Sequence, residues 1–134
     1  MVLTHQAGIG LSNHHILRKL RVLTVKLERV AHCRSGDKGN TSNISVIAYR
    51  QELYESLKSQ LNERQFQQHY AGVILGKVTR YSIDQLYALN FVCEGALGGG
   101  VSRSLCLDNY GKSLSSRILS FELVISAELE KYLK

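Results

Sequence analysis

Alternating apolar and polar residues mark the first recognisable element of the chain. In the segment VLTVKLERVA, Val25 and Leu27 alternate with charged residues, as in a strand with one buried face, so we expect a strand near residues 23–31. The later segment NISVIAY is apolar on both faces and predicts a central, buried strand. The polar stretch between these two segments should then be a loop that joins the ends of two strands.

A different spacing of apolar residues predicts two helices after these strands. Leucines recur every fourth residue from Leu53 to Leu61, with polar residues on the opposite side, which is typical of an amphipathic helix. Asn62 followed by Gln65 resembles a capping box at the start of another helix. The two expected helices cover residues 51–60 and 63–71, and Gly72 is the expected terminator of the second.

The C-terminal half returns to strand patterns interrupted by glycine. The segment GALGGG, residues 95–100, is too rich in glycine for the interior of an element and predicts a loop. The other expected elements are strands at GKVTRYSI (76–83), LYALNFVC (86–93) and VSRSLCLD (101–108), a short helix containing Leu114, Ile118 and Leu119, and a last strand at FELVIS (121–126).

This order of elements predicts an α+β fold. Without the first strand it reads β-α-β-β-α-β, which indicates a sandwich with helices on one face of a mostly antiparallel sheet. With 134 residues, 44% hydrophobic and 21% charged, the chain has the size and composition of one globular domain. We expect a single domain over residues 22–134, preceded by an N-terminal extension over residues 1–21.

The net charge of +6 is concentrated at the N-terminus. The first 27 residues carry four basic residues and no acid, which leaves 13 bases against 11 acids, or +2, for the rest. A broad basic surface for nucleic acid is therefore not expected. No apolar run has the length of a membrane span, and three cysteines without a metal-site spacing fit a reducing compartment. We expect a cytoplasmic protein, or a mitochondrial one if residues 1–20 are a presequence, with no membrane partner and no bound metal.

The stretch AHCRSGDKGNTSN, residues 31–43, gathers the residue types that hold an anion. Arg34 and Lys38 offer charges, several hydroxyl and amide side chains offer donors, and glycines expose backbone N–H groups. His32 beside Asp37 would provide a base with an orienting carboxylate. The same composition is also typical of a turn held by its own hydrogen bonds, so both interpretations stay open.

A second glycine-rich stretch, LGGGVSRS, would let a backbone approach a ligand closely, with Ser102 beside it; a flexible loop is the alternative. Nucleotide motifs are absent, since GDKGNTS is not a Walker A loop and GALGGG lacks the GxGxxG spacing. We therefore expect no cofactor. Gly36 to Gly39 match the GxxG of a KH domain, but strand-like segments flank them here.

Three segments resemble the signature segments of the C-terminal domain of the acyclic terpene utilisation protein AtuA, a domain that also occurs as a small free-standing protein. They are AHCRSGDKGNTSNISVIA, ALNFVCEGALGGG and LDNYGKSLSSRIL, and the similarity extends from about Leu23 to Ile125. The resemblance implies a ferredoxin-like α+β fold and an association with the catabolism of branched or isoprenoid acids as CoA thioesters. The large N-terminal domain of AtuA has no counterpart here, and Cys33 stands where a small residue such as alanine is expected.

The residues that match the family's motifs coincide with the candidate site. The expected ligand-binding residues are Arg34, Ser35, Gly36, Lys38, Gly39, Asn40, Thr41, Asn43, Asn90, Gly98, Gly99, Gly100 and Ser102, and the expected acid–base residues are His32 and Asp37.

Three functions follow from these residues. The first is a small accessory or binding protein that holds an acyl-CoA or a branched carboxylate, as a subunit for a larger AtuA-like partner. The second is an enzyme that acts on acyl-CoA thioesters through His32 and Asp37. The third is RNA binding by the GDKG segment. An open sheet leaves edges that invite pairing, so we also expect a homo-oligomer.

Overall fold

The computed structural model describes residues 21–38, 41–95 and 113–134. The strands are β1 (Val22–Lys26), β2 (Ala31–Lys38), β3 (Thr41–Ala48), β4 (Val78–Ile83), β5 (Ala88–Glu94) and β6 (Glu122–Ser126). The α-helices are α3 (Gln51–Gln60), α4 (Glu63–His69) and α6 (Ser113–Arg117), and short 3₁₀ segments are η1 (Leu27–Arg29), η2 (Asp84–Leu86), η4 (Ile118–Ser120) and η5 (Ala127–Tyr132). In this part of the chain, no helix is long and apolar enough to cross a membrane.

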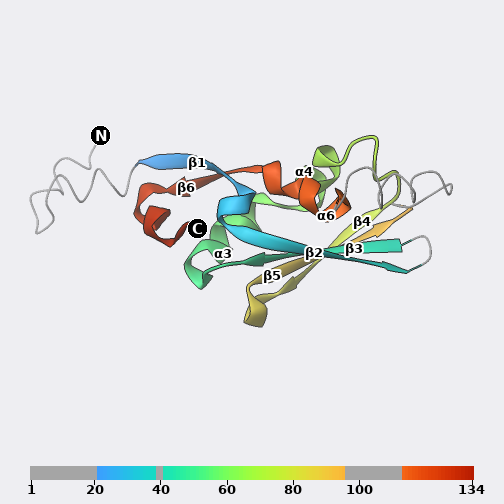
Figure 1. Ribbon diagram of the computed structural model, residues 1–134, viewed down its shortest axis with the longest axis horizontal. Helices are drawn as coiled ribbons and strands as arrows, with labels where there is room; N and C mark the ends of the chain where they lie inside the picture. The colour runs from blue at the N-terminus through green and yellow to red at the C-terminus, as the bar shows by residue number, and fades with distance from the viewer. Residues whose placement is uncertain (1–20, 39–40, 96–112) are drawn as a thin grey trace, which may run out of the picture.

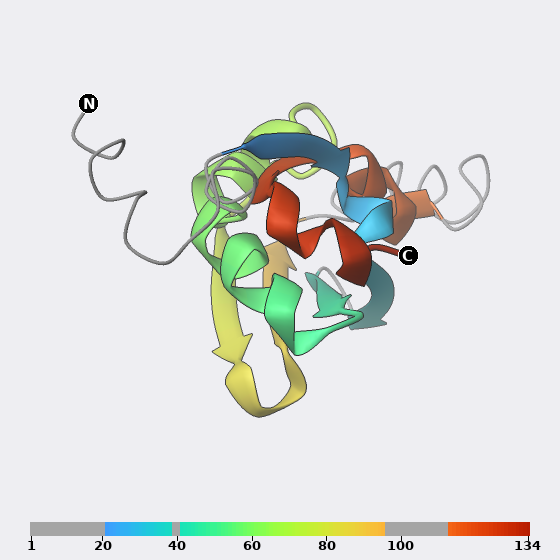
Figure 2. The ribbon, with the colours of Figure 1, turned by 90° about the vertical axis from the view of Figure 1, so that its left-hand side faces the viewer.

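The strands form two antiparallel sheets, which confirms the predicted α+β class (Figure 1). The larger sheet has the order β2-β3-β5-β4, and β1 pairs with β6 in a separate two-stranded sheet. Helix α3 contacts β3 on one side and β6 on the other, so it lies between the two sheets (Figure 2). The last strand therefore does not join the large sheet. The edge strand beside β3 in the large sheet is β2.

One face of the large sheet carries the core, and we call it the inner face. Along β3 every second residue is buried, from Ser42 to Ala48, while the residues between them are only half-buried. Helices α3, α4 and α6 each contact a strand of this sheet. Phe66 of α4 stacks on Phe91 of β5 with ring centroids 4.0 Å apart and planes 8° apart. The opposite, outer face is left without a helix by the described elements.

The predicted strand over residues 23–31 is wrong in extent, because the alternation that suggests it stops at Leu27. Leu27, Val30 and Ala31 are all fully buried, a spacing that an extended strand with one buried face cannot provide. The chain turns instead through η1, where the Leu27 amide donates to the carbonyl of Phe121 at 2.7 Å. The strand therefore divides into β1 in the small sheet and β2 in the large one.

The predicted loop over residues 32–43 is also wrong, because most of it is β-hairpin. Residues 31–38 form β2 and pair with β3 in a continuous antiparallel register from Ala31 opposite Ala48 to Lys38 opposite Thr41. This strand lies at the edge of the sheet, where only a few side chains reach the core. Polar residues are therefore tolerated along it.

The helix predictions agree closely with the structure. Helix α3 has the predicted bounds, and α4 begins after Asn62, whose side chain accepts a 2.8 Å hydrogen bond from the Gln65 amide. Gly72 follows with a positive φ of 85°, although α4 itself ends at His69. The turn between β4 and β5 lies slightly later than predicted and places Tyr87 in a left-handed conformation. The predicted strand over 101–108 and all but Gly95 of the predicted 95–100 loop lie outside the described residues.

The junction between α3 and α4 seals the edges of two different strands. The Gln60 side chain donates to the carbonyl of Val124 at 2.7 Å and accepts from its amide at 2.8 Å, as a neighbouring strand would. The Glu63 carboxylate accepts from the backbone amide of Arg80 at 2.9 Å. The Arg80 guanidinium in turn donates to carbonyls at the end of α3, including that of Leu61 at 2.9 Å. Backbone groups of β6 and β4 that no strand pairs are thus satisfied by side chains.

A second polar connection fixes the β4–β5 turn to α3. The Tyr54 hydroxyl lies 2.6 Å from Asp84 Oδ1, and Lys58 Nζ lies 3.1 Å from the same oxygen. Burial, together with the hydrogen bond to Asp84, raises the pKa of Tyr54 to about 12. The hydrogen bonds from Tyr54 and Lys58 hold the pKa of Asp84 below its usual value. The ionised form of Asp84 is therefore favoured by folding.

We predict that Gln60→Glu destabilises the protein. A carboxylate cannot donate to the Val124 carbonyl, so this acceptor loses its partner and faces a negative charge. Because this hydrogen bond is exposed to solvent, the expected loss is about 0.5–1.5 kcal/mol in the free energy of unfolding, measured by chemical denaturation. Gln68→Glu is the matched control, because Gln68 is an exposed residue of α4. Equal shifts of the two variants would show that Gln60 does not seal this edge.

We also predict that Tyr54→Phe reduces the pH dependence of stability. Because the pKa of Asp84 is lower in the folded chain than in the unfolded chain, the carboxylate stabilises the fold above its unfolded-state pKa. That contribution is lost as the pH falls through the folded-state pKa. Without the Tyr54 hydroxyl, the difference in unfolding free energy between pH 7 and pH 3 should shrink, whereas Tyr81→Phe, at an exposed tyrosine, should leave it unchanged. An unchanged difference in Tyr54→Phe would contradict the role of this hydrogen bond.

Candidate functional site

The hairpin of β2 and β3 distributes the candidate residues over two faces of the sheet. Successive side chains of a strand point to opposite faces, and directly opposed residues of neighbouring strands share a face. Arg34 is opposed to Ser45, and Gly36 is opposed to Asn43. Ser45 and Asn43 alternate along β3 with the buried residues, so they point away from the core. His32, Arg34 and Gly36 therefore belong to the outer face, while Ser35 and Asp37 belong to the inner one.

Three rows of directly opposed residues cross the outer face. They are His32–Ile47–Ala88–Ile83, Arg34–Ser45–Asn90–Tyr81 and Gly36–Asn43–Val92–Thr79. We call the second of these the Arg34 row. It contains two of the predicted ligand-binding residues, Arg34 on β2 and Asn90 on β5. Helices α3 and α4 lie between these strands in the sequence. The structure thus brings Arg34, Asn43 and Asn90 to one surface.

The Arg34 row combines an available cation with an unsatisfied acceptor. Arg34 is exposed, and it makes no hydrogen bond or ion pair to any described residue. Asn90 Oδ1 is enclosed by its surroundings and accepts no hydrogen bond from the described residues. An enclosed polar atom without a partner costs about 1–3 kcal/mol, so its presence at the centre of a sheet face calls for an explanation. Tyr81, 55% exposed, ends the row at β4.

Gly36 gives Asn43 its place on this face. A Cβ atom at Gly36 would lie 2.8 Å from Asn43 Oδ1, closer than such atoms approach, so a larger residue would displace the asparagine side chain. The missing side chain of Gly36 therefore leaves room for the Asn43 side chain across the hairpin. The backbone at Gly36 does not adopt a conformation that requires glycine.

His32 and Asp37 are not brought together. They lie five positions apart on an extended strand, about 17 Å, and on opposite faces, so Asp37 cannot orient the His32 ring. The His32 ring instead stacks on Tyr49, with centroids 5.5 Å apart and planes 27° apart, and Lys134 Nζ lies 4.7 Å from the centroid of the same tyrosine ring. The predicted acid–base pair is therefore wrong as a pair.

Three other groups in and near the polar stretch are occupied or inert. Ser42 is fully buried and donates its hydroxyl to the carbonyl of Gly36 at 3.2 Å, so it is not available to a ligand. Burial raises the pKa of the Cys33 thiol and of the Cys93 thiol to about 12. Both cysteines are therefore poor nucleophiles at neutral pH.

The remaining candidates lie at or beyond the end of the hairpin. Lys38 is opposed to Thr41, and Thr41 is opposed to Glu94 on β5, so the start of the glycine-rich stretch leaves the sheet beside the hairpin. Gly39, Asn40, Gly98, Gly99, Gly100 and Ser102 lie outside the described residues. Gly36 and Lys38 are strand residues, so the GDKG segment is not the loop between two helices that a KH domain uses.

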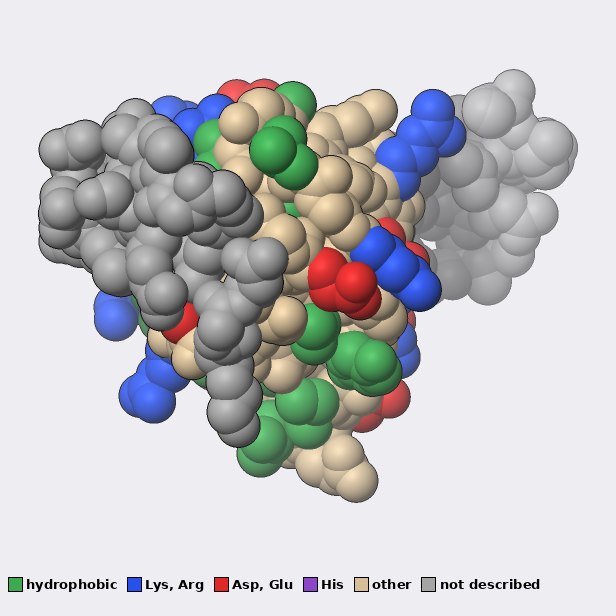
Figure 3. Space-filling view, turned by 90° about the vertical axis from the view of Figure 1, so that its right-hand side faces the viewer, with side chains coloured by type: hydrophobic (Ala, Val, Ile, Leu, Met, Phe, Trp, Pro, Cys, Tyr) green, Lys and Arg blue, Asp and Glu red, His purple; other side chains and the backbone are tan. Residues whose placement is uncertain are grey.

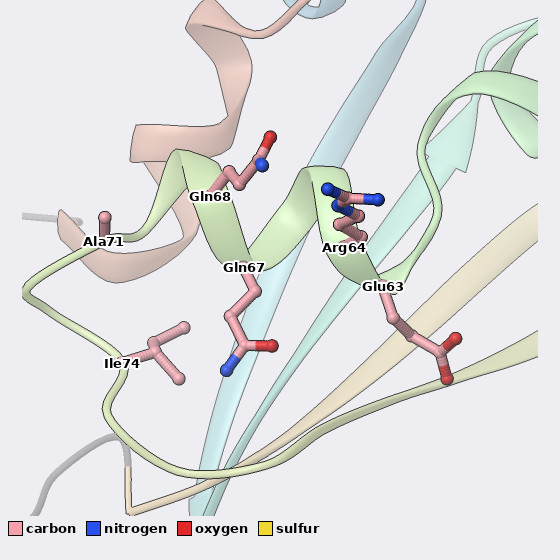
Figure 4. A pocket seen from close by; sticks show the side chains of 6 residues that line it. All are labelled: Glu63, Arg64, Gln67, Gln68, Ala71 and Ile74. Carbon is pink, nitrogen blue, oxygen red and sulfur yellow. The ribbon is translucent and has the colours of Figure 1, made fainter.

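The hollow beside α4 is a weaker candidate than the outer face. It is open to solvent and lined by Glu63, Arg64, Gln67, Gln68, Ala71 and Ile74 (Figure 4). Two of its polar side chains serve the fold, since Glu63 accepts from the Arg80 amide and Gln67 donates to the carbonyl of Gly76 at 3.0 Å.

On the end of the molecule where the hairpin lies, hydrophobic side chains gather in the lower part, beside acidic and basic ones (Figure 3).

Ser45 and Tyr81 belong to the site, although sequence reasoning did not select them. Both lie in segments that the sequence marks only as strands. The register supplies the missing information, because Ser45 opposes both Arg34 and Asn90, and Tyr81 opposes Asn90. A polar residue at the solvent-facing positions of a predicted central strand is the signal that could have pointed to Ser45.

Comparison with known families agrees with these features. The AtuA ferredoxin-like domain matches residues 25–124, which include the hairpin, both long helices and the Arg34 row. No curated protein and no solved structure gives a match to this chain. The matched residues cover more than half of the 134-residue chain, from β1 into β6. The chain therefore belongs to the AtuA ferredoxin-like domain family.

Proposed function

We propose that this protein is a small binding or accessory protein that holds an anionic ligand on the outer face of its large sheet. The observation that carries the proposal is the Arg34 row, in which an exposed guanidinium and an enclosed amide oxygen lie on one face of the sheet, neither of them paired with a described residue. Arginine matches carboxylate and phosphate groups with two parallel N–H donors. The ligand is accordingly a branched carboxylate or the CoA thioester of such an acid.

The neighbouring row suits the apolar part of such a ligand. Ile47 and Ile83 are half-buried on the outer face, on either side of the small Ala88. A short branched chain lying on this row would remove apolar surface from water, at roughly 25 cal/mol for each Å² buried. The carboxylate of a free acid would then reach the Arg34 row, the next row on this face, whereas in a CoA thioester the phosphates are the anionic groups. The sheet face thus offers adjacent apolar and polar stripes to an amphipathic molecule.

Binding is better supported than turnover. General acid–base catalysis needs a base that a second group orients, and the separation of His32 from Asp37 removes the pair that the sequence suggested. On the described part of the outer face, His32 is stacked on Tyr49 rather than held by a carboxylate. The family resemblance, with its link to the catabolism of branched and isoprenoid acids, favours the same class of ligand.

Assembly with a second chain completes the proposal. Side chains of the α3–α4 junction occupy backbone groups of β6 and of β4, at Val124 and Arg80. The β2 strand, polar and exposed from Arg34 to Asp37, is the edge at which another copy or a larger AtuA-like subunit would add a strand. This edge lies beside the Arg34 row, so a partner there would border the ligand.

The test is a titration of the isotopically labelled protein with 3-methylbutanoate and with 3-methylbutanoyl-CoA, followed by amide NMR shifts. Arg34→Ala should raise the dissociation constant at least about fivefold, since one exposed charge-assisted contact contributes about 1 kcal/mol. Arg64→Ala, which removes an equal charge from α4 on the other side of the sheet, should leave it unchanged. Absence of binding, or equal effects of both substitutions, would refute the proposed site.

A further inference from the structure

Asn90 restricts the class of ligand that fits the proposed site more than the Arg34 cation does. It lies on β5, one of the two central strands of the large sheet, with Ser45 on one side and Tyr81 on the other. Its Oδ1 atom is enclosed, and no donor in the part of the chain that the structure describes is its partner. An amide oxygen in such a place accepts a hydrogen bond from a ligand once the atoms that cover it move aside. What binds against it must therefore offer O–H or N–H.

The spacing of the strands places this acceptor near the anion. Neighbouring strands lie about 4.8 Å apart, so Arg34 and Asn90 are separated by about 9.6 Å across the intervening Ser45. The long arginine side chain can bring its guanidinium over Ser45. A carboxylate held there would lie about 5 Å from the Asn90 amide. A donor two or three bonds from the carboxylate carbon, together with a hydrogen bond of about 2.9 Å, spans this distance.

We propose that the ligand of the outer face is a small carboxylate that also carries a hydrogen-bond donor, either a hydroxyl or an amide N–H, and that Asn90 selects for this donor. This inference rests on the proposed function and specifies the ligand of the same site. Ser45 lies beneath the anion, and Tyr81 borders the donor end of the ligand. The donor satisfies Oδ1, which has no partner among residues 21–38, 41–95 and 113–134.

Such a site discriminates strongly against analogues that lack the donor. A polar group built to receive a hydrogen bond is left unpaired when the analogue replaces the donor by an apolar group, which costs more than the loss of an apolar contact. An analogue with a carbonyl oxygen in the same place is disfavoured too, because two acceptors then face each other. The expected preference for the donor-bearing ligand is about tenfold, which corresponds to about 1.4 kcal/mol.

Two isosteric pairs of ligands test this preference by the same NMR titration. The first pair is 3-hydroxy-3-methylbutanoate and 3,3-dimethylbutanoate, which differ by hydroxyl against methyl. The second is N-acetylglycine and 4-oxopentanoate, which differ by N–H against CH₂. We expect the donor-bearing member of at least one pair to bind about tenfold more tightly. Preference in the first pair alone identifies a hydroxyl donor, and preference in the second alone an amide donor.

Asn90→Leu, of similar volume, should abolish the preference while the binding of 3,3-dimethylbutanoate stays within about twofold, because only the acceptor is removed. Thr79→Val is the control: it removes a hydroxyl from the same face, outside the Arg34 row, and should keep the preference. Equal binding within both wild-type pairs, or a preference that survives in Asn90→Leu, overturns this inference and leaves the anion site standing. Absence of binding by every carboxylate defeats the proposed function itself.

Discussion

The two-residue period of side chains along an edge strand governs both the fold and the candidate site. Strand β2 pairs with β3 over its whole length, so each of its residues is assigned to the covered or to the open face of the sheet. That assignment keeps Arg34 with Asn90 and separates His32 from Asp37. A shift of β2 by one residue would move Arg34 to the covered face, and it is opposed by the burial of Ala31 on β2.

Much of the fold was predictable, and the failures have a common physical origin. The helices follow from local periodicity and from the Asn62 cap, both of which depend on residues close in sequence. The β2 strand escaped prediction because its stability comes from pairing with β3, while its own residues have the composition of a turn. The end of β1 was misplaced for a similar reason, since Leu27 and Val30 are buried by a change of direction.

The candidate site was predictable as a set of residue types but not as an arrangement. Arg34, Asn43 and Asn90 could be selected from motifs, yet their common face depends on the register among three strands. The odd spacing of His32 and Asp37 along β2 excludes the acid–base pair that sequence proximity suggests. Chemistry inferred from neighbours in sequence is therefore least dependable along a strand, where adjacent residues point in opposite directions and residues on other strands become the true neighbours.

The α3–α4 junction has a consequence for how this family can vary. Gln60 and Glu63 are three positions apart and serve two different sheets, so the length of chain between them must match the distance between those sheets. Insertion of one residue here would uncover two edges in the same event and create two templates for aggregation. The β4–β5 turn, whose tip exposes Leu86, is held by Asp84 to α3 and does not connect the two sheets. Length variation in evolution should accordingly accumulate at the hairpin tips and be purged at this short junction.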